Sequence, residues 1–428
     1  MESAAEQLRP LFEAVLGRPI PLRIALWDGS RTGDVDSPAV VTFRSPSALR
    51  RILYAPGELG FARAYVTGEL DVEGDLHSAV RMLSIASPEL SIGWKAFART
   101  ARAALSLGAL GAPLPPPPEE ARLRGRLHSI GRDREAVSHH YDLSNDFYEL
   151  ILGPSMTYSC ARFTEPSLSL EQAQAAKYEL ICNKLGLEPG MRLLDVGCGW
   201  GGMVIHAATH HDIEAVGVTI SEAQHDYAVK RVAQAGLAGR IDVRLQDYRE
   251  LAGEQFDAIS SIGMAEHVGR RELRGYFGVL TGLLRRGGRL LNHAISTPNG
   301  ASYDRRTFIA RYVFPDGELP DVAEVVTGMQ AHGLDVRDVE ALREHYAMTL
   351  RRWSANLEAS WDEACRLVGV QRARVWRLYL TGAAVGFEIA DTGIHQVLGV
   401  KLTEEGVSGM PLTRSAFDPP GAQPGSDS

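Results

Sequence analysis

Apolar and polar positions alternate between strand and helix patterns through the second half of the chain. Short apolar runs bounded by turn residues predict strands at 192–196, 215–219, 242–245, 256–262, 289–293 and 394–400. Helical patterns lie at 201–209, 221–235 and 271–284, and 342–390 is mostly helical. Because strands that alternate with helices are typical of a parallel sheet between helices, the pattern predicts an α/β domain with helical cover.

The first hundred residues follow a different pattern. Strand candidates at 21–27 and 39–43 precede helical patterns at 47–53, 57–67 and 76–83, which together predict a smaller α+β domain. A proline-rich stretch follows that cannot continue a helix. The predicted division is an N-terminal domain at 1–108, a Pro-rich and basic linker at 109–134, a main domain at 135–416 and a disordered tail at 417–428.

Composition narrows the class of protein. The 428 residues carry 45 Lys and Arg against 53 Asp and Glu, a net charge of −8, which argues against a nucleic-acid binder that relies on global positive charge. Four cysteines without CxxC spacing fit a reducing cytoplasm, and no metal site is indicated. Glu2 and Glu6 stand where a signal peptide needs basic residues, and no run approaches the ~20 apolar residues of a spanning helix. Any membrane contact is therefore expected to be peripheral.

A glycine-rich turn joins the first strand of the main domain to its helix. Gly197, Gly199 and Gly202 let the backbone approach a ligand closely, and Asp195 just before them is placed to hold a ligand's ammonium group. The second strand ends at Val218-Thr219 without the acid that grips an NAD ribose. The pattern thus favours S-adenosylmethionine (SAM) over a dinucleotide or a purely structural turn.

Two residues after the third strand extend this hypothesis. Asp247 is placed to accept a hydrogen bond from the adenine amino group, with Tyr248 as a stacking face. The alternative for Asp247 is a helix N-cap, a position that aspartate favours.

Five motifs occur together in the order typical of one family: His140-Tyr-Asp-Leu-Ser-Asn-Asp-Phe-Tyr148, Pro154-Ser-Met-Thr-Tyr-Ser-Cys-Ala161, Leu194-Asp-Val-Gly-Cys-Gly-Trp-Gly-Gly202, Met264-Ala-Glu-His-Val-Gly269 and Phe308 to Pro315. Through these motifs, residues from about 139 to 401 resemble the cyclopropane-fatty-acyl-phospholipid synthases and mycolic acid cyclopropane synthases, and the N-terminal domain resembles them more loosely. The resemblance implies a Rossmann-like class I SAM methyltransferase domain, preceded by the smaller α+β domain.

The resemblance also implies roles for individual residues. Cofactor contacts are expected from Tyr158, Ser159, Gly197, Gly199, Thr219, Ile220, Gln224 and Ile262. A bicarbonate ion acting as general base is expected on Cys160, Glu266, His293, Ile295 and Tyr346, and Tyr141 is expected to face the substrate. Each has a structural alternative: Cys160 as a buried apolar filler, His293 and Tyr346 as core residues, and Glu266 as a helix cap.

The implied chemistry requires such a site. A cis double bond is a poor nucleophile, so the sulfonium methyl must meet it in line in a dry pocket. Transfer leaves a carbocation that aromatic rings stabilise. Loss of a proton from the new methyl then closes a cyclopropane ring, or gives a methylene branch after a hydride shift. Glu266 is expected to accept the O–H of bicarbonate and His293 to donate to it, because two anions repel each other unless one is protonated.

The run from Phe387 to Val397 bears on the product. It resembles the actinobacterial branch of the family, which includes enzymes that form 10-methylene acyl chains. A cyclopropane and a methylene branch therefore both stay open.

The expected partners are a membrane phospholipid and an anionic membrane surface at the cytoplasmic face, with a homodimer left open. Basic residues expected to meet headgroups, or alternatively to form solvated helix faces, are Lys95, Arg99, Arg102, Arg122, Arg124, Arg126, Arg132, Arg134, Arg270, Arg271 and Arg274. Two rival functions are a SAM-dependent methyltransferase of a soluble small molecule, which would not need the N-terminal domain, and a non-catalytic lipid-binding protein.

Overall fold

The computed structural model describes residues 2–16, 19–86, 105–121, 143–251, 253–298 and 307–417. Its contacts divide the chain into two compact units. The larger unit contains the glycine-rich turn, and the smaller contains the N-terminal residues.

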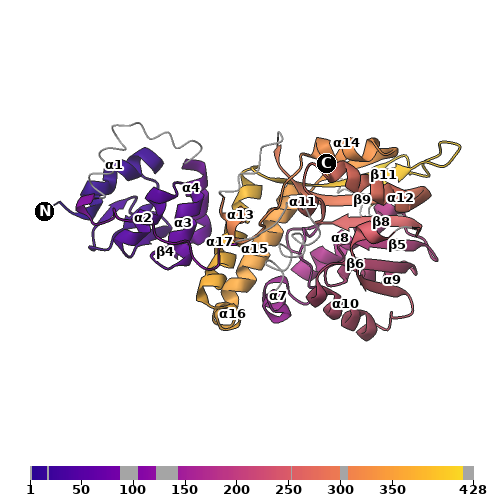
Figure 1. Ribbon diagram of the computed structural model, residues 1–428, viewed down its shortest axis with the longest axis horizontal. Helices are drawn as coiled ribbons and strands as arrows, with labels where there is room; N and C mark the ends of the chain where they lie inside the picture. Colours follow the sequence, from indigo (N-terminus) through magenta and orange to yellow (C-terminus); the bar gives the residue numbers. More distant parts are fainter. Residues whose placement is uncertain are drawn as a thin grey trace, which may run out of the picture. The chain divides into compact units, whose positions relative to one another are not determined.

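A seven-stranded sheet forms the centre of the larger unit (Figure 1). In spatial order its strands are β10 (Leu334–Ala341), β11 (Gly393–Lys401), β9 (Leu284–Ser296), β8 (Phe256–Ile262), β5 (Arg192–Val196), β6 (Glu214–Thr219) and β7 (Ile241–Leu245). From β9 to β7 in this order, neighbouring strands are parallel, whereas β11 pairs antiparallel with both β9 and β10. The predicted Rossmann-like fold is confirmed. Strand β10 was not predicted, because an edge strand with four charged residues carries a weak apolar signal.

Helices cover both faces of this sheet because successive side chains of a central strand point to opposite faces. On β5, Leu193 packs in one apolar cluster with residues of α8 (Leu170–Leu185) and α9 (Gly202–His210). Its neighbour Leu194 packs in the other cluster, with residues of α12 (Leu273–Leu283). This unit also contains α7 (Asn145–Leu152), α10 (Glu222–Gln234), α11 (Ala265–Val268), α14 (Val322–Gln330) and most of α15 (Arg343–Ala359). The last residues of α15, from Leu357, belong to the smaller unit.

The smaller unit is built on a four-stranded sheet (Figure 1), in the order β2 (Arg31–Gly33), β1 (Arg23–Ala25), β3 (Ala39–Phe43) and β4 (Leu70–Gly74). The predicted α+β character is confirmed, although α1, β2 and β4 were not predicted. Its N-terminal helices are α1 (Ala4–Leu16), α2 (Pro46–Tyr54), α3 (Glu58–Val66) and α4 (Leu76–Ala86). The unit also contains α13 (Phe308–Tyr312), α16 (Trp361–Val368) and most of α17 (Val370–Glu388), which sequence analysis assigned to the main domain.

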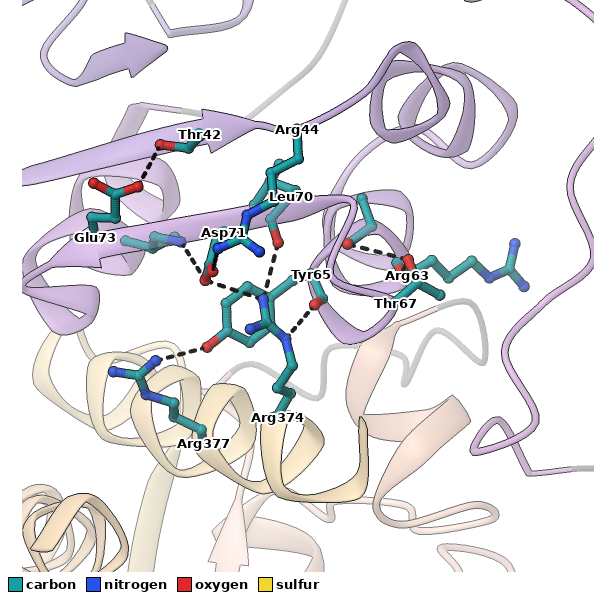
Figure 2. A network of polar contacts seen from close by, with 12 residues as sticks. Thr42, Arg44, Arg63, Tyr65, Thr67, Leu70, Asp71, Glu73, Arg374 and Arg377 are labelled. Atoms are coloured by element: carbon teal, nitrogen blue, oxygen red, sulfur yellow. Dashed lines mark hydrogen bonds and ion pairs between the residues drawn. The ribbon is translucent and has the colours of Figure 1, made fainter. Parts of the chain in front are cut away.

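A buried arginine explains why α17 joins the N-terminal residues. Figure 2 shows Arg374 of α17 donating to the carbonyls of Tyr65 (2.6 Å) and Leu70 (3.0 Å) and pairing with Asp71 at 3.2 Å. Its guanidinium carbon lies 4.0 Å from the centroid of the Tyr65 ring. A buried guanidinium needs this set of acceptors, and α3 and β4 supply them.

The folded chain reaches the start of the predicted tail. Phe417 is buried, and Asn183 Nδ2 donates to its carbonyl at 3.1 Å. Residues 418–428 lie outside the described part of the chain. Among the described helices, none combines the length and apolar character that crossing a membrane requires.

Candidate active site

The glycine-rich turn lies at the carboxyl end of β5, where ligands bind in open α/β sheets. Gly197 and Gly199 have positive φ angles of 75° and 53°. The amides of Gly197 and Cys198 donate to Val218 O of neighbouring β6 at 2.9 and 3.0 Å. A Cβ on Gly197 would lie 2.3 Å from Met264 Sδ, so a larger residue here would require the Met264 side chain to move and would also be strained by the positive φ angle.

Asp195 lies within the sheet directly before this turn. Its side chain is buried, and Ser260 Oγ of β8 donates to its Oδ1 at 2.7 Å. Burial raises the pKa of the Asp195 carboxyl to about 6. The structure therefore gives Asp195 a protein partner, and its contact with a cofactor ammonium stays a prediction.

Three polar residues, Thr219, Ser221 and Gln224, form a hydrogen-bonded cluster at the end of β6. Thr219 donates to Gln224 Oε1 at 3.0 Å and accepts from the amide of Ser221 at 3.2 Å. Ser221 also caps α10 by accepting from the amide of Gln224. These bonds bring together Thr219 and Gln224, both predicted cofactor contacts, beside the partly buried Ile220.

The structure shows the capping alternative for Asp247. Its carboxylate accepts from the amide of Arg249 at 2.9 Å and pairs with the Arg249 guanidinium at 2.7 Å. The ring of Tyr248 packs edge-on against Tyr276, with centroids 5.0 Å apart. Adenine contacts of Asp247 and Tyr248 stay predictions.

The segment with Tyr158 and Ser159 is held by one face of α8. Gln174 Nε2 donates to the Ser159 carbonyl at 2.9 Å, and Lys177 Nζ donates to the Ser159 hydroxyl at 3.1 Å. The ring of Tyr158 packs against that of Trp353, with centroids 5.2 Å apart. Because Ser159 Oγ accepts from the Lys177 amine, its own proton is free to donate to an anionic ligand group.

Sequence analysis missed Lys177. Its side chain is fully buried, with Nζ 3.7 Å from the centroid of the Tyr178 ring, and it interacts electrostatically with Cys160 and Asp195. Burial lowers the pKa of the Lys177 amine to about 7. The available signal was its spacing, because Ala173 and Ile181, four residues to either side, form the buried face of the same helix.

The acidic part of the site joins α11 to β9. Glu266 of α11 is buried, and its Oε1 accepts from the amide of Ile295 at 2.7 Å. Its other oxygen, Oε2, is also buried and has no hydrogen-bond partner among the described residues. Burial raises the pKa of the Glu266 carboxyl to about 7, against the opposing effect of the Ile295 amide.

His293 lies on β9, two residues before Ile295. It is 1% exposed, and its Nε2 is buried without a hydrogen-bond partner among the described residues. Burial holds the pKa of His293 well below its ordinary value, so the ring is neutral. The parallel pairing of β8 and β9 sets His293 beside Ile262, a predicted cofactor contact.

Cys160 and Tyr346 meet at the start of α15. Cys160 Sγ lies 3.7 Å from the carbonyl of Leu342, which also accepts from the amide of Tyr346 at 3.0 Å. Burial raises the pKa of the Cys160 thiol, so it stays protonated. The ring of Tyr346 packs against Phe387, with centroids 4.7 Å apart. A charge on the Lys177 amine would shift the pKa of both Cys160 and His293, which indicates that the three side chains lie in one region.

Several predicted contacts lie outside the described residues: Tyr141, Lys95, Arg99, Arg102 and all five arginines of 122–134. Arg270, expected at a headgroup-binding rim, instead pairs with Glu324 at 2.8 Å. Arg271 and Arg274 are exposed. Over the described residues, no group of three or more His, Cys, Asp or Glu side chains is arranged to hold a metal ion.

Known proteins are similar in sequence to most of this chain. Residues 128–397 match the family model described as mycolic acid cyclopropane synthetase. A probable fatty acid methyltransferase of Mycobacterium tuberculosis is 44% identical over 92% of this chain and 94% of its own length. The cyclopropane-fatty-acyl-phospholipid synthase of Escherichia coli is 33% identical over 87% and 90%.

Solved structures extend the similarity to three dimensions. The cyclopropane synthase MmaA2 from Mycobacterium tuberculosis superposes with a TM-score of 0.60 at 33% identity, covering 64% of this chain and all of that one. The mycolic acid cyclopropane synthase CmaA1 complexed with S-adenosylhomocysteine and CTAB gives a TM-score of 0.59 at 36% identity, covering 62% and 97%. The chain therefore belongs to the mycolic acid cyclopropane synthetase family and is a SAM-dependent methyltransferase.

Proposed function

We propose that this enzyme methylates the cis double bond of an unsaturated phospholipid acyl chain, with a bicarbonate ion as the base. The main support is a pair of buried polar atoms at the acidic part of the site, Glu266 Oε2 and His293 Nε2, neither of which has a hydrogen-bond partner in the described part of the chain. Leaving such atoms unpaired costs roughly 1–3 kcal/mol each. A polar ligand that accepts at one atom and donates at the other would remove that cost.

Bicarbonate matches both atoms. Its O–H can donate to Glu266 Oε2, while an anionic oxygen accepts from Nε2–H of neutral His293. Cys160 and Tyr346 are proposed to complete the anion site, and the buried Lys177 amine near Cys160 would favour an anion in its protonated form. When bound, the ion supplies a base that takes a proton from the methylated acyl chain.

The aromatic residues suit a cationic reaction. When bound, SAM supplies the methyl group on a sulfonium. Its transfer leaves the acyl chain with a carbocation, which the faces of aromatic rings stabilise. Tyr346 contacts Phe387 and Trp353, and Trp353 contacts Tyr158, so these rings form a continuous group reaching from the cofactor segment to Cys160. All four rings belong to the larger unit.

Two products follow from the same cation. Direct loss of a proton from the new methyl closes a cyclopropane ring. A prior hydride shift moves the charge to the methylated carbon, and loss of the same proton then gives a methylene branch. The phospholipid substrate agrees with the name of the Escherichia coli relative, a cyclopropane-fatty-acyl-phospholipid synthase. The acyl chain would enter from the cytoplasmic leaflet, with the enzyme bound peripherally.

Labelling of lipids tests the reaction. The chain is expressed in a host that contains oleate and lacks its own cyclopropane synthase, and the cells are fed methionine with a ¹³C-methyl group. We expect labelled ring or methylene carbon in phospholipid acyl chains, distinguished by fragmentation in mass spectrometry. Label that never enters the acyl chains would reject the proposed substrate.

Variants and buffer composition test the base. Glu266→Gln and His293→Ala should lose turnover but keep SAM binding, whereas the exposed Glu250→Gln should behave as wild type. Purified enzyme in buffer freed of CO₂ should slow, and added bicarbonate should restore the rate where chloride does not. A rate that is indifferent to bicarbonate would exclude the ion as base.

A further inference from the structure

Gln396 occupies a place next to His293 that sequence analysis did not assign to the site. It lies on β11, directly opposite His293 in the antiparallel pairing of β11 with β9. Both side chains are fully or almost fully buried, at 0% and 1% exposure. Gln396 Nε2 lies 3.4 Å from His293 Nδ1, at the long end of hydrogen-bond distances.

The chemistry of this contact fixes which ring nitrogen carries the proton. In this structure the Gln396 amide directs Nε2 toward His293 Nδ1, and its Oε1 is buried without a hydrogen-bond partner among the described residues. Because an amide nitrogen only donates, His293 Nδ1 accepts in this orientation. A neutral imidazole has one proton, which is then on Nε2. Nε2 is the buried atom without a partner among the described residues, and it is therefore a donor.

The position of this proton determines whether His293 can donate to a ligand in the buried site. The opposite tautomer would place a lone pair on Nε2, beside a site that already contains the carboxylate of Glu266, and it could not donate to an anion. With Nε2–H, the site offers one donor at His293 and one acceptor at Glu266 Oε2. A ligand that both donates and accepts is then bound in one orientation.

We infer that Gln396 is a positioning residue, which keeps the His293 proton on Nε2 so that the ring donates to the bound anion. This inference rests on the proposed function, since it assigns His293 a role toward the base. The role is indirect: Gln396 acts through His293 and is not proposed to touch the acyl chain.

The test combines tautomer and kinetics. Long-range ¹H–¹⁵N spectra of enzyme labelled on histidine report which nitrogen is protonated, and the loss of one set of signals in His293→Gln assigns the ring. We expect Nε2–H in the wild type. In Gln396→Leu we expect a mixture of tautomers and a kcat lowered about tenfold or more, with the KM for SAM within about twofold.

Two further variants sharpen the test. Gln396→Glu places an acceptor at Nδ1, so the proton should move to Nδ1 and the rate should fall further. His395→Gln is the matched control: it removes the 2.9 Å contact of His395 with Ser296 between the same two strands, on the other face of the sheet. It should keep both the His293 tautomer and the rate.

The outcomes are separable. An Nδ1–H tautomer in the wild type, or a Gln396→Leu enzyme with unchanged tautomer and kcat, would overturn the inference. With the ring assigned through His293→Gln, the wild-type tautomer tests the inference even if the Gln396 variants fail to fold. A bicarbonate-independent wild-type rate would instead remove the proposed base, while the spectra would still report what Gln396 does to His293.

Discussion

Replacing Glu266 by glutamine should stabilise the ligand-free protein at alkaline pH while it abolishes turnover. The folded protein raises the pKa of this carboxyl from an ordinary 4.5 to about 7, mainly by burial. Between those two pH values the folded state keeps a proton that the unfolded state has lost. Stability is therefore fully present below about pH 4.5 and falls as the pH rises through about 7.

The magnitude follows from the two pKa values. At 1.36 kcal/mol per pH unit, the difference corresponds to about 3 kcal/mol of stability lost by pH 8. Glutamine keeps an oxygen to accept from the Ile295 amide, and it cannot ionise. Glu266→Gln should thus exceed the wild type by up to about 3 kcal/mol at pH 8 and match it near pH 4.5.

Calorimetric thermal unfolding of ligand-free protein across pH 5 to 8 measures this effect. Exposed Glu250→Gln is the matched control and should follow the wild-type curve. Parallel pH curves for wild type and Glu266→Gln would refute the assignment of a buried, proton-retaining carboxyl. Equal turnover of the two proteins would refute its part in catalysis.

Three other substitutions test the cofactor segment and the smaller unit. Lys177→Met should weaken SAM binding about tenfold or more by titration calorimetry, because it removes the amine that donates to Ser159. Unchanged affinity would contradict the role of that contact. Gly197→Ala should abolish SAM binding and lower the melting temperature, since its Cβ would lie 2.3 Å from Met264 Sδ. Gly190→Ala is the control: its φ of 82° is similar but the space around it is open, so it should cost only backbone strain. Arg374→Leu should destabilise the protein by about 3–5 kcal/mol in denaturant unfolding. Arg366→Leu, which breaks an exposed ion pair, should cost less than about 1 kcal/mol. Equal losses would argue against a stabilising role for the buried contacts of Arg374.

The cofactor turn could be read from the sequence because its constraints are local. Positive φ angles at Gly197 and Gly199 are properties of a few adjacent residues, and the strand before them contains the apolar residues Leu193, Leu194 and Val196. The same holds for Asp247, whose capping role involves only the next two residues. The ion pair of Asp247 with Arg249 was not predicted, because a charged residue near the end of a strand is ordinarily expected to be exposed to solvent.

The acidic part of the site was found by motif, and its geometry was not. Glu266 and Ile295 are 29 positions apart, and their hydrogen bond exists because β8 and β9 are parallel neighbours. Gln396 lies 103 positions from His293, and only the antiparallel insertion of β11 beside β9 brings them together. Neither pairing leaves a signal in local hydrophobic patterning.

By itself, the sequence determined the α/β alternation of the main domain, the glycine turn and the family, since each depends on periodicity or on short runs of residues. Tertiary structure alone decided that Lys177 is buried beside Ser159, that α17 packs with the N-terminal residues through Arg374, and that Gln396 faces His293. The physical reason is that burial and polar pairing between distant segments depend on strand order and helix packing. A lysine, an arginine or a glutamine looks the same in the sequence whether it faces water or the interior.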